Sequence, residues 1–505
     1  MITNRSYITK VVVLILVVFG IHSQTHAQSV IELVRAEVIE YDQEFVDAER
    51  VKGNVQFKQD GVIMDCDSAY FFRKDNRLEA YGDIYIRQKD TFNLWGDYLE
   101  YDGNTKKALV RNNVRMTDGE MQLSTNAIEY DVQSKTAYYV NGGDIVNGSD
   151  RLNSRVGHYY SRSKVFSFKD SVKLRNVDYT MFSDTLNYNS NTKTAFFHGP
   201  TTIVSDENTI FCRYGWYDTR NNTSQFSKGA WIAGGTNKLT ADSFVYNRNT
   251  GVGEAFRNIS LVDTVEKVKI YGTYGITYRL TGKTMVTGSP IAVQESEDDT
   301  LYLVADTLLD QRSDSGERVL NAFPETRLYR NDIQGVCDSL AYHFTDSFIV
   351  MLGVPILWSD SSQITGDTLT IFRKNGQMDR MTVRKNAFIN SYIEFDHFNQ
   401  IDGRDMDAIF GGNKLKEVDV FGNGQSVYYV QDDDSAYIGA SHIICSNMKI
   451  LLHQNKVEDV KYYDSPTGGL YPLNDFPAEH KKLKNFVWFP ERRPNRDELL
   501  KRLPE

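Results

Sequence analysis

The chain has 505 residues, of which 41% are hydrophobic and 12% aromatic, and its formal net charge is −10 at pH 7. This composition is sufficient for a packed core and excludes a disordered chain. The acidic balance argues against nucleic acid as a partner, because phosphate binding depends on clustered lysine and arginine.

Residues 1–27 have the pattern of a secretory signal peptide. Arg5 and Lys10 precede an apolar run from Val11 to Phe19, and Thr25-His26-Ala27 offers a small-residue cleavage site. A membrane anchor is the weaker alternative, because the run is about half of the ~20 residues that span a bilayer. We therefore expect cleavage after Ala27 and export of the mature chain.

One short pattern then recurs every 29 to 37 residues. Clear copies are 94–101, 123–130 and 239–246. Each has an apolar residue, a small residue two positions later, a polar anchor, and apolar or aromatic residues two and four positions after the anchor. Thirteen anchors run from Asp67 to Ser441. A fixed period in this range is typical of solenoids and other stacked-repeat folds.

A second strand-like segment, such as 78–84, completes each repeat and ends in a turn rich in Gly, Asn and Lys. The slot before each anchor always holds a small residue. The apolar positions before and after the anchor differ in parity, so a flat strand would place them on opposite faces. A bend at the small slot would turn both inward. We predict an all-β, extended stack of about thirteen two-strand repeats with such a bend.

The apolar position three residues before each anchor forms a ladder that could line a groove or pack into a sealed core. This ladder continues through Ile364 and Ile401 to Ile438, with Gly335 as an exception. We take the ladder residues of the regular half as candidate lipid contacts. They are Met64, Leu94, Leu123, Leu152, Met181, Ile210, Leu239 and Ile270.

The anchor column itself is expected to form a surface row of charges and turns. A calcium ladder is the functional alternative, but its Gly-Gly-x-Gly-x-Asp spacing is missing. Cys66, Cys212 and Cys337 occupy the small slot in distant repeats, and stacking would hold them beyond the ~7 Å limit for a disulfide. We expect them to be buried, free thiols. We predict no metal and no cofactor.

Past Tyr463 the composition changes to a basic tail that carries six of the ten prolines. This tail is expected to cap the last repeat or to dock on a protein or on lipid headgroups, with a short helix over 497–503. The predicted organisation is a signal peptide (1–27), regular repeats (28–290), repeats with insertions (291–465) and the tail (466–505).

No motif of a metalloprotease, a serine hydrolase or a nucleotide-binding loop is present. A β-helix enzyme that cleaves acidic polysaccharides is the enzymatic alternative, through a pair of carboxylates. The irregular acidic stretches 295–299 and 431–434 lack an accompanying base. We therefore predict a protein that is not an enzyme.

Four segments carry a resemblance to a known family. They are Gly53-Asn54-Val55, the strand 94–101, Lys106-Lys107-Ala108 and Asn112-Asn113-Val114. The repeat resembles the OstA-like repeat of the LptA/OstA family of periplasmic lipopolysaccharide-transport proteins, over roughly 30–465.

The resemblance implies a β-jelly-roll or taco-like body, open along one seam, whose apolar groove shields the acyl chains of lipopolysaccharide or a related lipid. It implies a location in the periplasm or at the outer membrane. The implied partners are other β-jelly-roll transport proteins, joined by edge-to-edge strand addition, and an outer-membrane assembly protein. This chain is far longer than the short bridge protein of the family, so an extended bridge or an accessory protein is expected. A structural or adhesive cell-surface solenoid is the rival interpretation.

Overall fold

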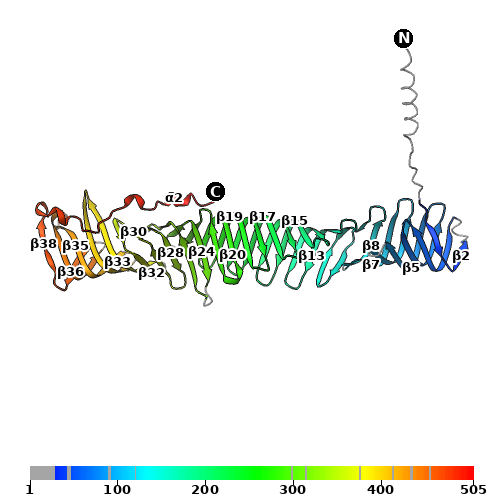
Figure 1. Ribbon diagram of the computed structural model, residues 1–505, viewed down its shortest axis with the longest axis horizontal. Helices are drawn as coiled ribbons and strands as arrows, with labels where there is room; N and C mark the ends of the chain where they lie inside the picture. Colours follow the sequence, from blue (N-terminus) through cyan, green and yellow to red (C-terminus); the bar gives the residue numbers. More distant parts are fainter. Residues whose placement is uncertain are drawn as a thin grey trace, which may run out of the picture. The chain divides into compact units, whose positions relative to one another are not determined.

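The computed structural model describes residues 29–41, 47–88, 92–119, 121–296, 299–312, 316–374, 377–411, 414–432, 436–453 and 456–504. The predicted signal peptide lies outside the described residues. The chain divides into two compact units, Met1–Val177 with Asn189–Asn191, and Asp178–Tyr188 with Thr192–Glu505. Each unit is an antiparallel β structure (Figure 1).

The first unit contains β1 (Glu32–Arg35), β2 (Val38–Tyr41), β3 (Glu49–Gln59), β4 (Val62–Phe72), β5 (Arg77–Gln88), β6 (Phe92–Asp102), β7 (Lys107–Asp118), β8 (Met121–Asp131), β9 (Thr136–Tyr139), β10 (Gly143–Asn147), β11 (Asp150–Ser154), β12 (Val156–Tyr160) and β13 (Val165–Arg175).

The second unit begins with the long strands β14 (Thr180–Asn189), β15 (Thr194–Val204), β16 (Thr209–Asp218), β17 (Thr223–Gly234), β18 (Asn237–Asn247), β19 (Val252–Asp263) and β20 (Val268–Tyr278). Shorter strands follow: β21 (Lys283–Thr287), β22 (Ile291–Glu295), β23 (Thr300–Val304), β24 (Thr307–Arg312), β25 (Arg318–Phe323), β26 (Thr326–Tyr329), β27 (Gln334–Cys337), β28 (Ser339–His343), β29 (Phe348–Leu352), β30 (Ile356–Ser359), β31 (Ser362–Thr365) and β32 (Thr368–Lys374). The 3-10 turn η1 (Arg279–Thr281) lies between β20 and β21. The unit ends with β33 (Gln377–Glu394), β34 (His397–Gly411), β35 (Lys414–Gln431), β36 (Tyr437–His453), β37 (Lys456–Tyr463), β38 (Thr467–Pro472), the 3-10 turns η2 (Leu473–Asp475), η3 (Ala478–His480) and η4 (Pro490–Arg492), and the helix α2 (Arg496–Leu500).

The predicted bend is confirmed as a corner within each long strand. On β4, Met64 before the anchor and Ala69 and Phe71 after it are all buried, although their parity differs. At the corner two residues of β5, Gly82 and Asp83, stand opposite a single residue of each neighbouring strand, and both have positive φ. A β-bulge of this kind reverses the facing of the strand. Both apolar ladders therefore point inward.

Alternate strands repeat this corner, and glycine or asparagine usually fills it because these residues tolerate positive φ at low cost. Such pairs lie on β3 (Gly53, Asn54), β7 (Asn112, Asn113), β13 (Asp170, Ser171), β17 (Lys228, Gly229), β19 (Arg257, Asn258), β33 (Lys385, Asn386) and β35 (Gly422, Asn423).

The anchor residues pair with corner residues of the intervening strand rather than with one another. Asn113 donates to the Asp97 carboxylate over 2.6 Å, and Arg155 reaches the Asp170 carboxylate over 2.6 Å. Each anchor and the next are two strands apart, so the corner residue lies between them. The anchor column is thus a surface row of turns and charges, as predicted.

Between β20 and β33 the corner separates the strands into two series of short strands. One series pairs in the order β21, β24, β25, β28, β29, β32, and the other in the order β22, β23, β26, β27, β30, β31. A single apolar cluster between the two series includes Leu303, Leu328, Met351 and Ile371. The core of this part therefore lies between two sheets.

The predicted tail caps and docks on its own chain. Its first part, β38, pairs with β36. Residues 473–504, which we call the C-terminal strap, then return along the outer face of the sheet to Leu499, which is buried against Ile291 and Tyr302 (Figure 1). The predicted short helix is confirmed as α2, and the Asn495 side chain caps it by accepting from the Asp497 amide over 2.9 Å.

Cys66, Cys212 and Cys337 are free and buried, as predicted, and so is Cys445, for which no prediction was made. Burial raises the pKa of the Cys66 thiol to about 12. Within the described part of the chain, no helix is long and apolar enough to cross a membrane.

Candidate functional site

All eight ladder residues point into the interior, but their burial differs. Met64, Leu94, Leu123, Leu152, Met181 and Ile270 are buried, with at most 6% of their surface exposed, whereas Ile210 and Leu239 are only half-buried. Whether these residues contact lipid stays a prediction.

The ladder has twice as many members as the sequence pattern indicated. In the first unit, Ile86 lies between Met64 and Leu94 in register, and Met116 lies between Leu94 and Leu123. These residues come from the intervening strands. The apolar character of Ile86 and Met116 was visible in the sequence. The repeat pattern, however, was defined on the strands that carry the anchors, so it did not include residues of the strands in between.

In the second unit the same register row is apolar over most of its length. From Ile203 it runs through Ile210, Ile232, Leu239, Leu261, Ile270, Ala292, Leu303, Leu328, Gly335, Leu357, Ile364 and Ile389 to Ile401. Beyond Ile401 the row continues through Ser426 to Ile443. The predicted last member, Ile438, is wrong: it is 54% exposed. The longer strands β34 and β35 shift the register there.

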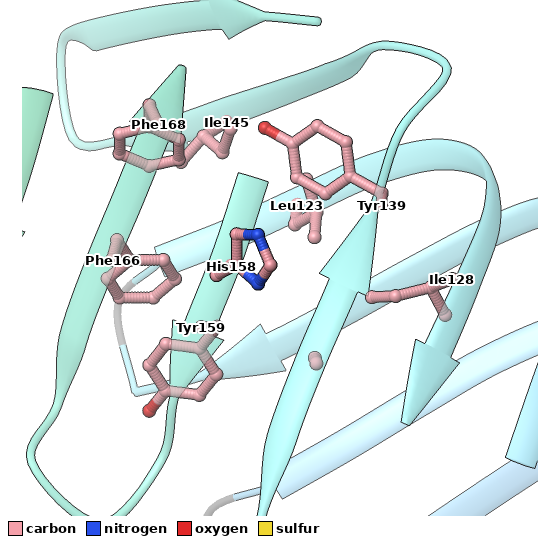
Figure 2. A pocket seen from close by; sticks show the side chains of 9 residues that line it. Leu123, Ile128, Tyr139, Ile145, His158, Tyr159, Phe166 and Phe168 are labelled. Atoms are coloured by element: carbon pink, nitrogen blue, oxygen red, sulfur yellow. The ribbon is translucent and has the colours of Figure 1, made fainter. Parts of the chain in front are cut away.

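The interior of the first unit is packed around Leu123. The cavity beside it measures only about 10 Å³, and Figure 2 shows the aromatic rings of Tyr139, Phe166 and Phe168 converging on it. The Tyr139 hydroxyl lies 2.6 Å from the Ser154 hydroxyl. A cavity of this size holds about one water molecule. An acyl chain has no room here in this conformation.

Tyrosine–glutamine hydrogen bonds close the first unit along the edge opposite the corner, which we call the seam. The Tyr101 hydroxyl donates to Gln59 over 2.6 Å, and the Tyr130 hydroxyl donates to Gln88 over 2.7 Å. Each bond joins a glutamine at the end of one strand to a tyrosine near the end of a later strand, across the seam. The second bond lies one repeat after the first. Gln59 is 2% exposed, so water does not compete strongly for this bond.

Two charged pairs join strand ends in the early part of the second unit. Arg248 contacts Asp178 over 2.5 Å, and Arg279 contacts Glu207; the side chains of both pairs are 41 to 61% exposed. Exposed pairs of this kind contribute little, about 0.2–1 kcal/mol each. Ile210 and Leu239, which lie in this stretch, are the half-buried members of the predicted ladder.

A buried ion pair ends this more open stretch. Arg318 donates to Asp263 over 2.6 Å and to Asp310 over 2.9 Å, and Asp263 is 1% exposed. Arg312 lies 3.4 Å from the same Asp263 carboxylate. Burial opposes the charge of Arg318, but Asp310 and Asp263 raise its pKa above the ordinary value.

The interior opens again near the end of the ladder into a cavity of about 670 Å³. Its inner wall is apolar and includes Ile364, Ile389 and Ile401 of the register row, together with Phe410 and Leu415. Ligand sites in proteins are commonly 300–1,000 Å³. Ile364 and Ile401 belonged to the predicted ladder column, but the insertions around them obscured the cavity.

The rim of this cavity is polar. Ser362 and Ser391 lie opposite each other in register, and their hydroxyls are 2.7 Å apart. Deeper in the cavity, in the ladder row, the buried Ser426 hydroxyl lies 3.2 Å from the Tyr462 hydroxyl. Asp360 and Asp432 also belong to the lining. The cavity is therefore amphipathic, with an apolar interior and a hydroxyl-rich rim.

The comparison with protein-family models agrees with the resemblance that the motifs indicated. The family model described as OstA-like protein matches residues 28–184. A comparison with curated protein sequences finds no match. Matching solved structures include LptH from Pseudomonas aeruginosa, described as the LptA-homologous periplasmic component of the conserved lipopolysaccharide transport device. It is 14% identical, with a TM-score of 0.21, and the match covers 22% of this chain and 83% of LptH.

Proposed function

We propose that this chain, OstA-like over residues 28–184, is a non-enzymatic carrier in lipopolysaccharide transport. In this proposal its apolar interior shields the acyl chains of lipopolysaccharide or a related lipid. The observation that carries the proposal is the register row of apolar residues that leads into the amphipathic cavity of about 670 Å³.

The physical chemistry of acyl chains fits such an interior. Each buried methylene contributes about 0.8 kcal/mol, so a stretch of ten contributes roughly 8 kcal/mol before the costs of ordering. Ile210, Leu239 and the cavity wall offer partly exposed apolar surface to such a chain. The fully buried members of the ladder would contact lipid only after the seam opens.

A structural or adhesive solenoid is the second candidate. The packed interior around Leu123, with its cavity of about 10 Å³, favours it for the first unit. In that case the ladder would serve only as a core.

The proposed location is the periplasm or the face of the outer membrane, after cleavage of the signal peptide. We propose that other β-jelly-roll transport proteins add a strand at the exposed edge of the first unit, and that an outer-membrane assembly protein is a further partner. The edge strand β2 supports this, since Val38, Ile39 and Tyr41 are 44%, 52% and 80% exposed. Exposed strand edges are templates for strand addition.

Photo-crosslinking tests the carrier function directly. A benzophenone amino acid replaces Phe410, which lines the cavity, or Phe421, which is 40% exposed on the outer face of β35. The exchange conserves an aromatic ring at both positions. With purified lipopolysaccharide we expect adducts at position 410 and none at position 421. Equal adducts, or no adduct at position 410 in a folded protein, would favour the structural solenoid.

A further inference from the structure

A surface cleft of about 790 Å³ lies over the corner of the first unit, between β7 and β13. It extends over three corners, at Asn113, Gly142 and Ser171, all of which have positive φ. Amide and hydroxyl side chains, most of them exposed, predominate in its lining: Asn113, Ser124, Thr125, Asn126, Asn141, Asn153, Ser154 and Ser171. Among the described lining residues the only apolar side chain is that of Val114, and it is 1% exposed. The cleft therefore presents a polar surface to solvent.

The geometry of the corner does not account for all of these asparagines. Asn113 has positive φ and donates to the Asp97 carboxylate, so it has a structural role. Asn126, Asn141 and Asn153 do not have positive φ. Within the described part of the chain, the structure also gives their side chains no hydrogen-bond partner. These three amides are therefore available to a ligand.

An aromatic stack lies next to the cleft on the same outer row of side chains. In register this row is Tyr85, Trp95, Arg115, Ser124, Asp144 and Asn153. The rings of Tyr85 and Trp95 are half-buried and stack with centroids 5.3 Å apart and 7° between their planes. Tyr85 of β5 thus covers one face of the Trp95 ring, and β7 with the cleft lies on the other side.

Strand addition does not suit this cleft, because its described strands have no free edge. β8 pairs with β7 on one side and with β9 and β10 on the other. β9 and β10 pair in turn with β12 and β11, and both of these pair with β13. An extended peptide would need an unpaired edge.

The charges of the lining nearly balance. Arg155 pairs with Asp170 over 2.6 Å, and the other two charged lining residues, Arg115 and Asp144, have opposite signs. A polyanion or a polycation would find no excess of the opposite charge here. Recognition by hydrogen bonds to amides and hydroxyls remains as the chemistry that this lining offers.

We propose that the cleft binds an uncharged oligosaccharide. A sugar hydroxyl both donates and accepts hydrogen bonds, and an asparagine amide offers an acceptor oxygen and two donor N–H groups to match it. The C–H face of a sugar ring at the β7 end would pack on Trp95, as apolar surfaces do on aromatic rings. The proposal goes beyond the carrier function and does not depend on it, because the cleft lies on the outer surface and acyl chains would lie in the interior.

Saturation-transfer NMR on the full mature chain tests the proposal. The probes are maltohexaose, laminarihexaose, mannohexaose, chitohexaose, and the lipid-free polysaccharide of a lipopolysaccharide whose repeating unit is uncharged. We expect at least one probe to bind at millimolar concentration or below, and dextran sulfate not to displace it. Binding of the lipid-free polysaccharide alone would identify the sugar part of lipopolysaccharide as the ligand, and binding of a hexasaccharide would identify a glycan of another source. Binding of no probe, or displacement by dextran sulfate, would overturn the proposal.

Variants assign the binding to this cleft. Asn126→Ala and Asn153→Ala remove exposed amides without a partner in the fold, so the protein should stay folded and bind the sugar at least threefold more weakly. The matched control is Asn237→Ala, the same substitution at an exposed position of β18, which should leave binding unchanged. Trp95→Leu should weaken binding as well. Wild-type binding in both cleft asparagine variants would place the sugar elsewhere and overturn the proposal, whereas the crosslinking test at position 410 would be unaffected.

Discussion

Replacing Gln363 by methionine tests how the C-terminal strap is held. Gln363 is fully buried; its amide nitrogen donates to the carbonyl of Val487 over 2.8 Å, and its amide oxygen accepts from the amide of Phe489 over 2.8 Å. Asn390 also donates to the Val487 carbonyl, over 2.7 Å. The substitution therefore leaves that carbonyl paired but removes the partner of the Phe489 amide.

The expected cost follows from these two losses. One redundant hydrogen bond contributes about 0.5–1 kcal/mol, and an unpaired buried amide costs about 1–3 kcal/mol. A total of about 1.5–4 kcal/mol corresponds to a roughly 10- to 900-fold larger opening constant for this part of the strap.

Limited trypsinolysis measures the opening, because cleavage of a transiently opened segment follows its equilibrium population. The strap offers Lys484 and Arg492 on either side of the Gln363 contact. The control is Gln377→Met, the same substitution at an exposed position of β33. A rate increase below about threefold, or roughly 0.7 kcal/mol, in a folded Gln363→Met variant would refute the idea that buried amides hold the strap.

Three further perturbations have defined outcomes. The His442 ring packs edge-on against His480 of the strap at 4.3 Å, and burial together with the charge of His480 lowers the pKa of His442. This stabilising contribution is complete above pH 6.5 and is lost as the pH falls below it. Amides over 476–484 should therefore have smaller hydrogen-exchange protection factors, which are corrected for the intrinsic exchange rate at each pH, at pH 5 than at pH 7.5, and the loss should be smaller in His480→Phe. Arg318→Met leaves the buried carboxylate of Asp263 with Arg312, 3.4 Å away, as its remaining cation, and should cost up to about 3–5 kcal/mol, seen as a lower Tm that Asp263→Asn partly restores; an unchanged Tm would contradict the buried pair. Gly82→Ala should cost about 1–3 kcal/mol in chemical denaturation because the corner needs positive φ and close approach, and a neutral result would contradict this account.

The corner was predictable from the sequence because its causes are local. A small residue before each anchor and the change of parity from Met64 to Phe71 are both visible within one strand. The pairs Gly82-Asp83 and Asn112-Asn113 mark the opposing strand in the same way. A hairpin joins the two strands, so one 29-residue repeat contains all the residues that form the corner.

The strap contacts and the cavity could not be predicted in this way. Gln363, Asn390 and Gln400 are neighbours in register, yet the sequence intervals between them are 27 and 10 residues, because β31 is short and β33 is long. Without knowledge of the strand register, these three amide side chains look like unrelated polar residues in the sequence. The same long strands displaced the last predicted ladder residue, Ile438, to the surface.

The strap also has a mechanical consequence. It joins β36, through β38, to the apolar cluster around Tyr302, and it lies alongside the strands in between. Gln400, Gln363 and Gln334 bind it at successive points. A pull along the strap would load these contacts together in shear, whereas a pull on α2 away from the sheet would peel them off one after another. The second unit is therefore expected to resist stretching between those strands far better than it resists lifting of its own C-terminus.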